Sequence, residues 1–144
     1  MKSLSNVLLV AASLALLSVG AASSQTAPSL NGQYKGTMVC ALPLGGGAVV
    51  RAPLDMIVTD NTVTFGRPIF NGNNVVGNEI VMGTIEEGKL ILASSGTQGA
   101  THYEGKYAGA ITPDGGTFTG IQSFTTADAT RTRPCTGAFV KSRS

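Results

Sequence analysis

The sequence predicts an all-β protein, a small antiparallel β-barrel of about eight strands with one disulfide. Short segments of alternating polar and apolar residues recur along the whole chain after residue 30. No segment combines a helical period of 3.6 with capping residues, so the crossover helices that a parallel sheet needs are not expected. The only two cysteines lie near opposite ends of this region. A two-sheet β-sandwich is the alternative architecture.

The strands follow one another with short connections. Seven segments have strand patterning: residues 32–42, 48–58, 61–66, 78–85, 89–95, 102–112 and 116–126. An eighth strand is expected within residues 131–141, beginning at Pro134, because proline cannot donate to a sheet and is usual at a strand start. Residues 44–48 and 70–78 are rich in glycine or asparagine and are interpreted as loops.

The hairpin around Pro113-Asp114-Gly115 has two candidate registers. A two-residue turn at Asp114-Gly115 would place Ile111 opposite Phe118, whereas a three-residue turn would place Ile111 opposite Thr117. The choice decides which face of the hairpin is apolar. We favour the first register because it gathers the apolar side chains on one face, although the residue types of the turn suit the second.

A pattern of glycine, any residue, aromatic, any residue, glycine occurs three times, at residues 32–36, 105–109 and 116–120. Alternation places each aromatic ring and its glycines on the same face of a strand. A ring can then cover the gap left by a glycine of the neighbouring strand, which favours tight closure of a small barrel. The functional alternative is an aromatic-lined pocket that includes Tyr34 and Tyr107.

The N-terminus is typical of an exported protein. Lys2 precedes an uncharged apolar run and a series of small residues, which predicts a signal peptide over residues 1–22. Residues 23–30 are interpreted as a flexible leader, and residues 31–144 as a single domain. We expect a periplasmic or extracellular protein with no membrane anchor in its mature form, because the apolar run is too short for a comfortable transmembrane helix.

Export to an oxidising compartment predicts a structural disulfide between Cys40 and Cys135. The pairing requires the first and last strands to lie side by side or to face each other across a sandwich. Arg131 and Arg133 precede the second cysteine and would form a positively charged rim, suited to carboxylate, sulfate or phosphate groups. The alternative is that they pair with Asp128 or Glu104, or simply keep a strand edge soluble.

The sequence offers little material for catalysis. His102 is the only histidine, neither cysteine is expected to be free, and no phosphate-binding loop or calcium-loop spacing is present. We therefore expect no enzymatic activity, no metal and no cofactor. The formal net charge of +2 also argues against a nucleic-acid partner.

The exported, eight-strand outline with these glycine-aromatic strands is loosely similar to avidin-like and lipocalin-like barrels, and to small disulfide-bonded barrels that inhibit lysozymes or proteases. The resemblance implies architecture and assigns no site residue. The sequence favours a non-catalytic protein that binds a small or anionic ligand at a barrel mouth or rim through Arg131, Arg133, Tyr34 and Tyr107. The alternative is an interaction module, such as an inhibitor of an extracytoplasmic hydrolase, that acts through residues 70–78.

Overall fold

The computed structural model describes residues 28–42, 49–71 and 73–143. The expected signal peptide, most of the expected leader and the expected loop at 44–48 lie outside these residues. The strands are β1 (Gly32–Ala41), β2 (Val49–Thr59), β3 (Thr62–Asn71), β4 (Asn74–Glu86), β5 (Lys89–Gln98), β6 (Thr101–Thr112), β7 (Gly115–Thr125) and β8 (Thr130–Lys141). All eight expected strands are present.

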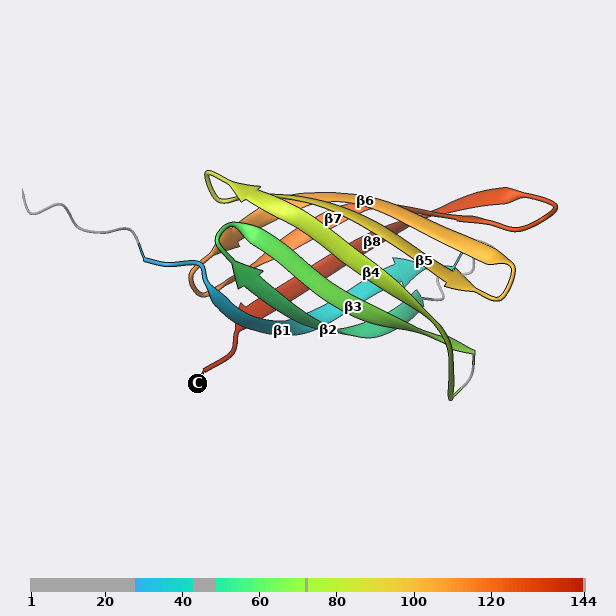
Figure 1. Ribbon diagram of the computed structural model, residues 1–144, viewed down its shortest axis with the longest axis horizontal. Coiled ribbons are helices and arrows are strands. Elements are labelled where there is room, and N and C mark those ends of the chain that lie inside the picture. Colours follow the sequence, from blue (N-terminus) through green and yellow to red (C-terminus); the bar gives the residue numbers. More distant parts are fainter. Residues whose placement is uncertain (1–27, 43–48, 72, 144) are drawn as a thin grey trace, which may run out of the picture.

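Each strand pairs antiparallel with the next, and β8 pairs with β1, which closes the sheet into a barrel (Figure 1). The closing pairs run from Tyr34 opposite Lys141 to Cys40 opposite Cys135. The two cysteines form a disulfide with Cα atoms 4.0 Å apart. The prediction of a disulfide-bonded β-barrel is therefore confirmed, and the sandwich alternative is not adopted.

The two ends of the barrel differ. One end, which we call the base, contains the start of β1, the end of β8 and the tight turns after β2, β4 and β6. Two of these turns contain consecutive residues with positive φ, Asp60-Asn61 and Glu87-Gly88, as two-residue hairpins require. We call the mouth the opposite end, where the β3–β4 and β7–β8 hairpins project beyond the body of the barrel (Figure 1).

The barrel interior is filled by side chains in its base half. Alternation along each strand turns one face inward, and the inward side chains form one apolar cluster. Its largest members include Tyr34, Phe118 and Phe139, each at most 4% exposed. Their rings pack at centroid distances of 5.8 Å for Tyr34–Phe139 and 6.3 Å for Phe118–Phe139. This half is a packed core and not a container.

Glycines let the aromatic rings lie close to the neighbouring strands. Tyr107 lies opposite Gly120, and Phe118 lies opposite both Gly109 and Gly137. A Cβ atom added at Gly120 would lie 2.7 Å from the Tyr107 ring, which is too close for a real contact. The structural interpretation of the glycine-aromatic pattern, tight closure of a small barrel, is confirmed.

Both expected registers of the β6–β7 hairpin are wrong. Thr112 pairs with Gly115, so the turn residues are Pro113 and Asp114, and Ile111 lies opposite Gly116. The favoured register differs from the observed one by two residues and therefore gave the correct inward faces, since side chains alternate with a period of two. The observed register places Tyr107 opposite Gly120 and Phe118 opposite Gly109, a cross-strand fit that turn chemistry does not reveal.

Two strand boundaries also differ from expectation. Strand β8 begins at Thr130 and not at Pro134, so both arginines lie within it. The pairing of β8 with β1 ends at Cys135, one residue before Pro134 is reached. Pro134 therefore pairs on one side only, with Ile121 of β7. Proline is tolerated at such an edge. The expected loop at 70–78 is mostly strand, since β3 ends at Asn71 and β4 starts at Asn74.

Candidate functional site

The mouth half of the interior contains a buried ion pair. Arg67 of β3 lies directly opposite Glu79 of β4, and both side chains point inward. The Arg67 Nε atom donates to Glu79 Oε2 at 2.7 Å, and Nη2 donates to the same oxygen. Their exposed fractions are 3% and 0%. Buried charges of this kind are stable only when they are paired and hydrogen-bonded.

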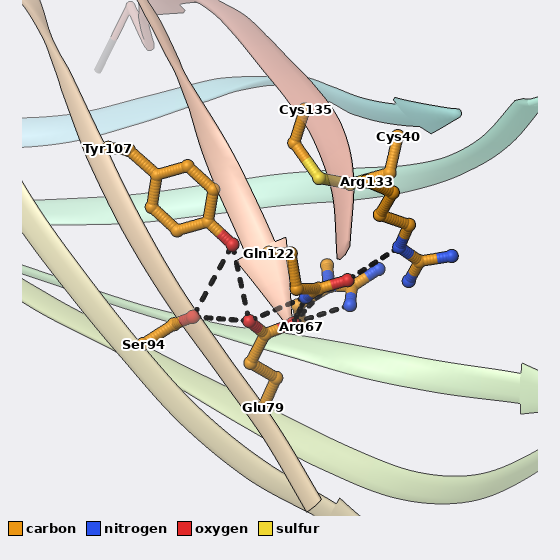
Figure 2. Close-up of a disulfide and its surroundings, with 8 residues drawn as sticks. All are labelled: Cys40, Arg67, Glu79, Ser94, Tyr107, Gln122, Arg133 and Cys135. Atoms are coloured by element: carbon orange, nitrogen blue, oxygen red, sulfur yellow. Dashed lines mark hydrogen bonds and ion pairs between the residues drawn. A yellow bond between two sulfur atoms is a disulfide. The ribbon is translucent and has the colours of Figure 1, made fainter. Parts of the chain in front are cut away.

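Three further side chains saturate the Glu79 carboxylate (Figure 2). The Gln122 amide nitrogen lies 2.8 Å from Oε1 and 2.6 Å from Oε2. The Ser94 hydroxyl donates to Oε1, and the Tyr107 hydroxyl reaches the same oxygen at 3.4 Å. Burial and the nearby Glu79 charge raise the pKa of Tyr107 to about 12. Tyr107 is therefore neutral at physiological pH and serves as a hydrogen-bond donor.

Arg133 of β8 adds a second cation to this network. Its Nε atom donates to the Gln122 carbonyl oxygen at 2.7 Å, so Gln122 connects Arg133 to Glu79. The side chain is only 8% exposed. Burial first, and then repulsion from Arg67, lowers the pKa of Arg133 from its usual value. The Arg133 guanidinium also lies 5.8 Å from the centre of the Phe124 ring, within range of a cation–π contact.

The charges of this network do not balance. Arg67 neutralises Glu79, but Arg133 forms no ion pair within the part of the chain that the structure describes. Every Asp and Glu of the sequence lies in that part. No described residue accepts a hydrogen bond from the two terminal nitrogens of Arg133. The buried network therefore carries one excess positive charge at its mouth side, where an anion could compensate it.

Next to Arg133, the β7–β8 hairpin forms a small recess of about 310 Å³. It is lined by Phe124, Thr126, Asp128, Ala129 and Arg131. The Phe124 ring packs on Tyr103 of β6 with a centroid distance of 6.1 Å, and the Tyr103 hydroxyl donates to Gln98 at 2.8 Å. The recess therefore has an aromatic wall whose orientation is fixed by its neighbours.

The structure brings together two of the four predicted ligand-binding residues, Arg133 and Tyr107, in one network. Arg131 lies one inward position further out on β8, where it is exposed and forms no ion pair with Asp128. Tyr34 is at the base, opposite Lys141. Since Lys141 and Arg133 are eight residues apart on one strand, Tyr34 lies roughly 26 Å from Arg133 along the strand direction.

Sequence reasoning missed the partners of Arg133: Arg67, Glu79, Ser94 and Gln122. Each shares the inward parity of its strand with apolar residues, as Arg67 does with Phe65 and Glu79 with Val81. A polar residue at an inward position is a detectable sign of a buried polar network. Which of these residues meet depends on the cross-strand register, which the sequence left undetermined.

Other features of the described residues give no comparable site. His102 is exposed on β6, and its Nε2 atom lies 3.2 Å from Glu104 Oε1. No group of three or more His, Cys, Asp or Glu side chains in the described ranges could hold a metal ion. Within the same ranges, no helix has the length and apolar character needed to cross a membrane.

A larger groove, of about 750 Å³, lies on the outer surface over strands β4 to β7. Its walls include Met82, Ile91 and Ile121, and Lys106 is its one charged lining residue. A specific small-molecule site usually combines apolar walls with several convergent polar groups. The mouth has such groups and the outer groove does not, so we place the candidate site at the mouth.

Comparison of the chain with protein-family models, curated proteins and solved structures finds no match. The candidate site is therefore defined by geometry and charge alone.

Proposed function

We propose that this chain is an exported, non-catalytic binding protein that recognises a small anionic ligand at the mouth of its barrel. The observation that carries the proposal is the Arg133 side chain, which is buried and positively charged without a carboxylate partner in the described structure. The two terminal nitrogens of Arg133 have no acceptor among the described residues, and the buried side-chain atom without a partner there is Ser142 Oγ, so these nitrogens reach solvent at the mouth. A bound anion would replace that solvent and compensate the charge through charge-assisted hydrogen bonds to the terminal nitrogens.

Two features support the choice of the mouth. Arg131 adds a second positive charge at the entrance, which favours the approach of an anion from solvent. The Arg67–Glu79 pair and Gln122 hold the inner end of Arg133, so that its guanidinium group is oriented before a ligand arrives. Such orientation lowers the entropy lost on binding.

A disulfide is compatible with an oxidising location, and the periplasm or extracellular space is part of this proposal. The predicted signal peptide supports the same compartment.

The test is a titration of the mature protein with sodium acetate and with inorganic phosphate, followed by NMR of the arginine Nε–H resonances. We expect a saturable shift of the Arg133 resonance for at least one of the two anions. In the Arg133→Gln variant, that anion should bind at least about 10-fold more weakly, since a charge-assisted hydrogen bond contributes about 1.5–3 kcal/mol.

The matched control is Arg51→Gln, which removes the same charge from an exposed position on β2. It should leave the affinity within about 2-fold of wild type. Arg133→Lys keeps the charge but loses the planar guanidinium group and should bind with intermediate affinity. Equal binding by wild type and Arg133→Gln, or no shift with either anion, would refute an anion site at Arg133.

A second candidate function is inhibition of an extracytoplasmic hydrolase through the β3–β4 hairpin. One observation favours it: the hairpin projects from the mouth and exposes Phe70 and Val75 to 45% and 57%. Large exposed apolar side chains on a projecting element are typical of protein contacts. The Arg133→Gln variant separates the two functions, because an inhibitor acting through the hairpin would retain its activity.

A further inference from the structure

We infer that the ligand of the mouth is a small monocarboxylate with a single flat aromatic ring, its carboxylate on Arg133 and its ring against Phe124 in the recess of the β7–β8 hairpin. This inference rests on the proposed function and specifies the ligand class.

The charge of the ligand follows from the network. Arg67 and Glu79 cancel, so Arg133 contributes one excess positive charge. The Nε atom of Arg133 already donates its hydrogen bond to the Gln122 side chain, and the two terminal nitrogens remain on the mouth side. These nitrogens present parallel N–H groups that match the two oxygens of one carboxylate. One planar monoanion completes the site.

The recess argues against a second acidic group on the ligand. Asp128 lines it together with Phe124 and Arg131, and Asp128 forms no ion pair among the described residues. Because Asp128 and Arg131 both line the recess, their charges offset each other, and a second carboxylate would gain no net attraction there. The part of the ligand in the recess is therefore uncharged.

The aromatic character of the ligand follows from Phe124. This ring is partly exposed, lines the recess, and lies within 5.8 Å of the Arg133 guanidinium. Tyr103 packs on it and restricts its motion. Flat rings pack favourably on such a surface in offset or edge-to-face arrangements. The recess volume of about 310 Å³ is at the lower limit of small-molecule sites, which suits one ring.

The experiment is a calorimetric titration of the mature wild-type protein with three monoanions: acetate, cyclohexanecarboxylate and benzoate. The last two have the same charge and similar size and differ mainly in the flat aromatic ring. We expect benzoate to bind about 2- to 10-fold more tightly than cyclohexanecarboxylate, the range of an aromatic pair. Terephthalate, with a second carboxylate, should bind no more tightly than benzoate.

Two variants assign the effect to its residues. Phe124→Leu keeps an apolar side chain but removes the ring, so the preference for benzoate over cyclohexanecarboxylate should disappear. Arg133→Gln should weaken binding of all three monocarboxylates. Thermal unfolding of each variant verifies that the barrel is intact.

The outcomes separate the two proposals. If wild type binds none of the carboxylates and no phosphate, the anion site itself is refuted. If it binds acetate or phosphate but shows no preference for benzoate, or if Phe124→Leu retains the preference, the aromatic monocarboxylate is refuted and the anion site stands. Tighter binding of terephthalate than of benzoate would also contradict the inference, because Asp128 and Arg131 together leave the recess without a net positive charge.

Discussion

The base half and the mouth half of one barrel interior are built on different principles. In the base half, Tyr34, Phe118 and Phe139 fill the space with aromatic surface, and each is stabilised by its removal from water. In the mouth half, Glu79 and Arg133 also point inward from their strands, but they depend on specific polar partners. The same alternation of strand residues thus produces an apolar core at one end and a charged network at the other.

The difference indicates what each half contributes. Well-packed apolar residues in place of a buried ion pair are often neutral or stabilising. Stability alone therefore does not account for charges inside the mouth half, whereas recognition of an anion would. The predictions below test whether the base half determines stability and the mouth half determines binding.

The largest expected effect comes from the disulfide, which joins β1 and β8 at the level of the mouth half. Replacing Cys40 and Cys135 with Ser should lower the free energy of unfolding by about 4–5 kcal/mol in the chain-entropy model, because the bond closes a long loop. The sequence separation of the two cysteines is 95 residues. Urea unfolding, with the reduced wild type as the control, measures the loss. A change below about 1 kcal/mol would contradict the model.

The next effect tests the buried ion pair. Glu79→Gln leaves Arg67 as an unpaired buried charge and should destabilise the fold by about 3–5 kcal/mol. The double substitution Arg67→Met with Glu79→Leu should cost less than this single one, because no charge is left buried. Phe139→Leu in the base half is the control, and its cost should add to that of Glu79→Gln, since Phe139 packs on Tyr34 and Phe118 and neither of these hydrogen-bonds Glu79. A double variant less stable than Glu79→Gln would show that the pair itself stabilises the barrel.

The sequence predicted the fold well because local patterns determine it. The eight strands follow from period-two alternation, and the adjacency of the first and last strands follows from Cys40 and Cys135. The favoured hairpin register also gave the correct inward face for Phe118, although its pairing was wrong by two residues. Facing depends only on parity, whereas pairing depends on how rings such as Phe118 fit against glycines of the next strand.

The candidate site was predicted only in part for the same reason. The charge of Arg133 and its position near Cys135 predict it as a site residue, but a strand that begins at Pro134 does not predict its burial. Its partner Gln122 comes from β7, and the carboxylate behind it, Glu79, comes from β4. These residues meet only after closure of the barrel, which no local pattern in the sequence specifies.

The smallest effect concerns pH. Burial, and then the nearby Glu79 charge, raises the pKa of Tyr107 from its ordinary value of 10.0 to about 12. The folded state therefore keeps the proton at a pH where the unfolded chain has lost it. The stability linked to Tyr107 is fully present below pH 10, and it is lost as the pH rises through the folded-state value of about 12.

We therefore expect Tyr107→Phe to lose less stability than wild type between about pH 9 and pH 11.5, by about 2 kcal/mol. Urea unfolding at the two pH values measures the difference. Burial also raises the pKa of Tyr34 in the base half, so part of the alkaline loss should remain in the variant. Equal alkaline losses in wild type and Tyr107→Phe would mean that the Tyr107 hydroxyl is not buried beside Glu79, and the mouth network would then lack one of its donors.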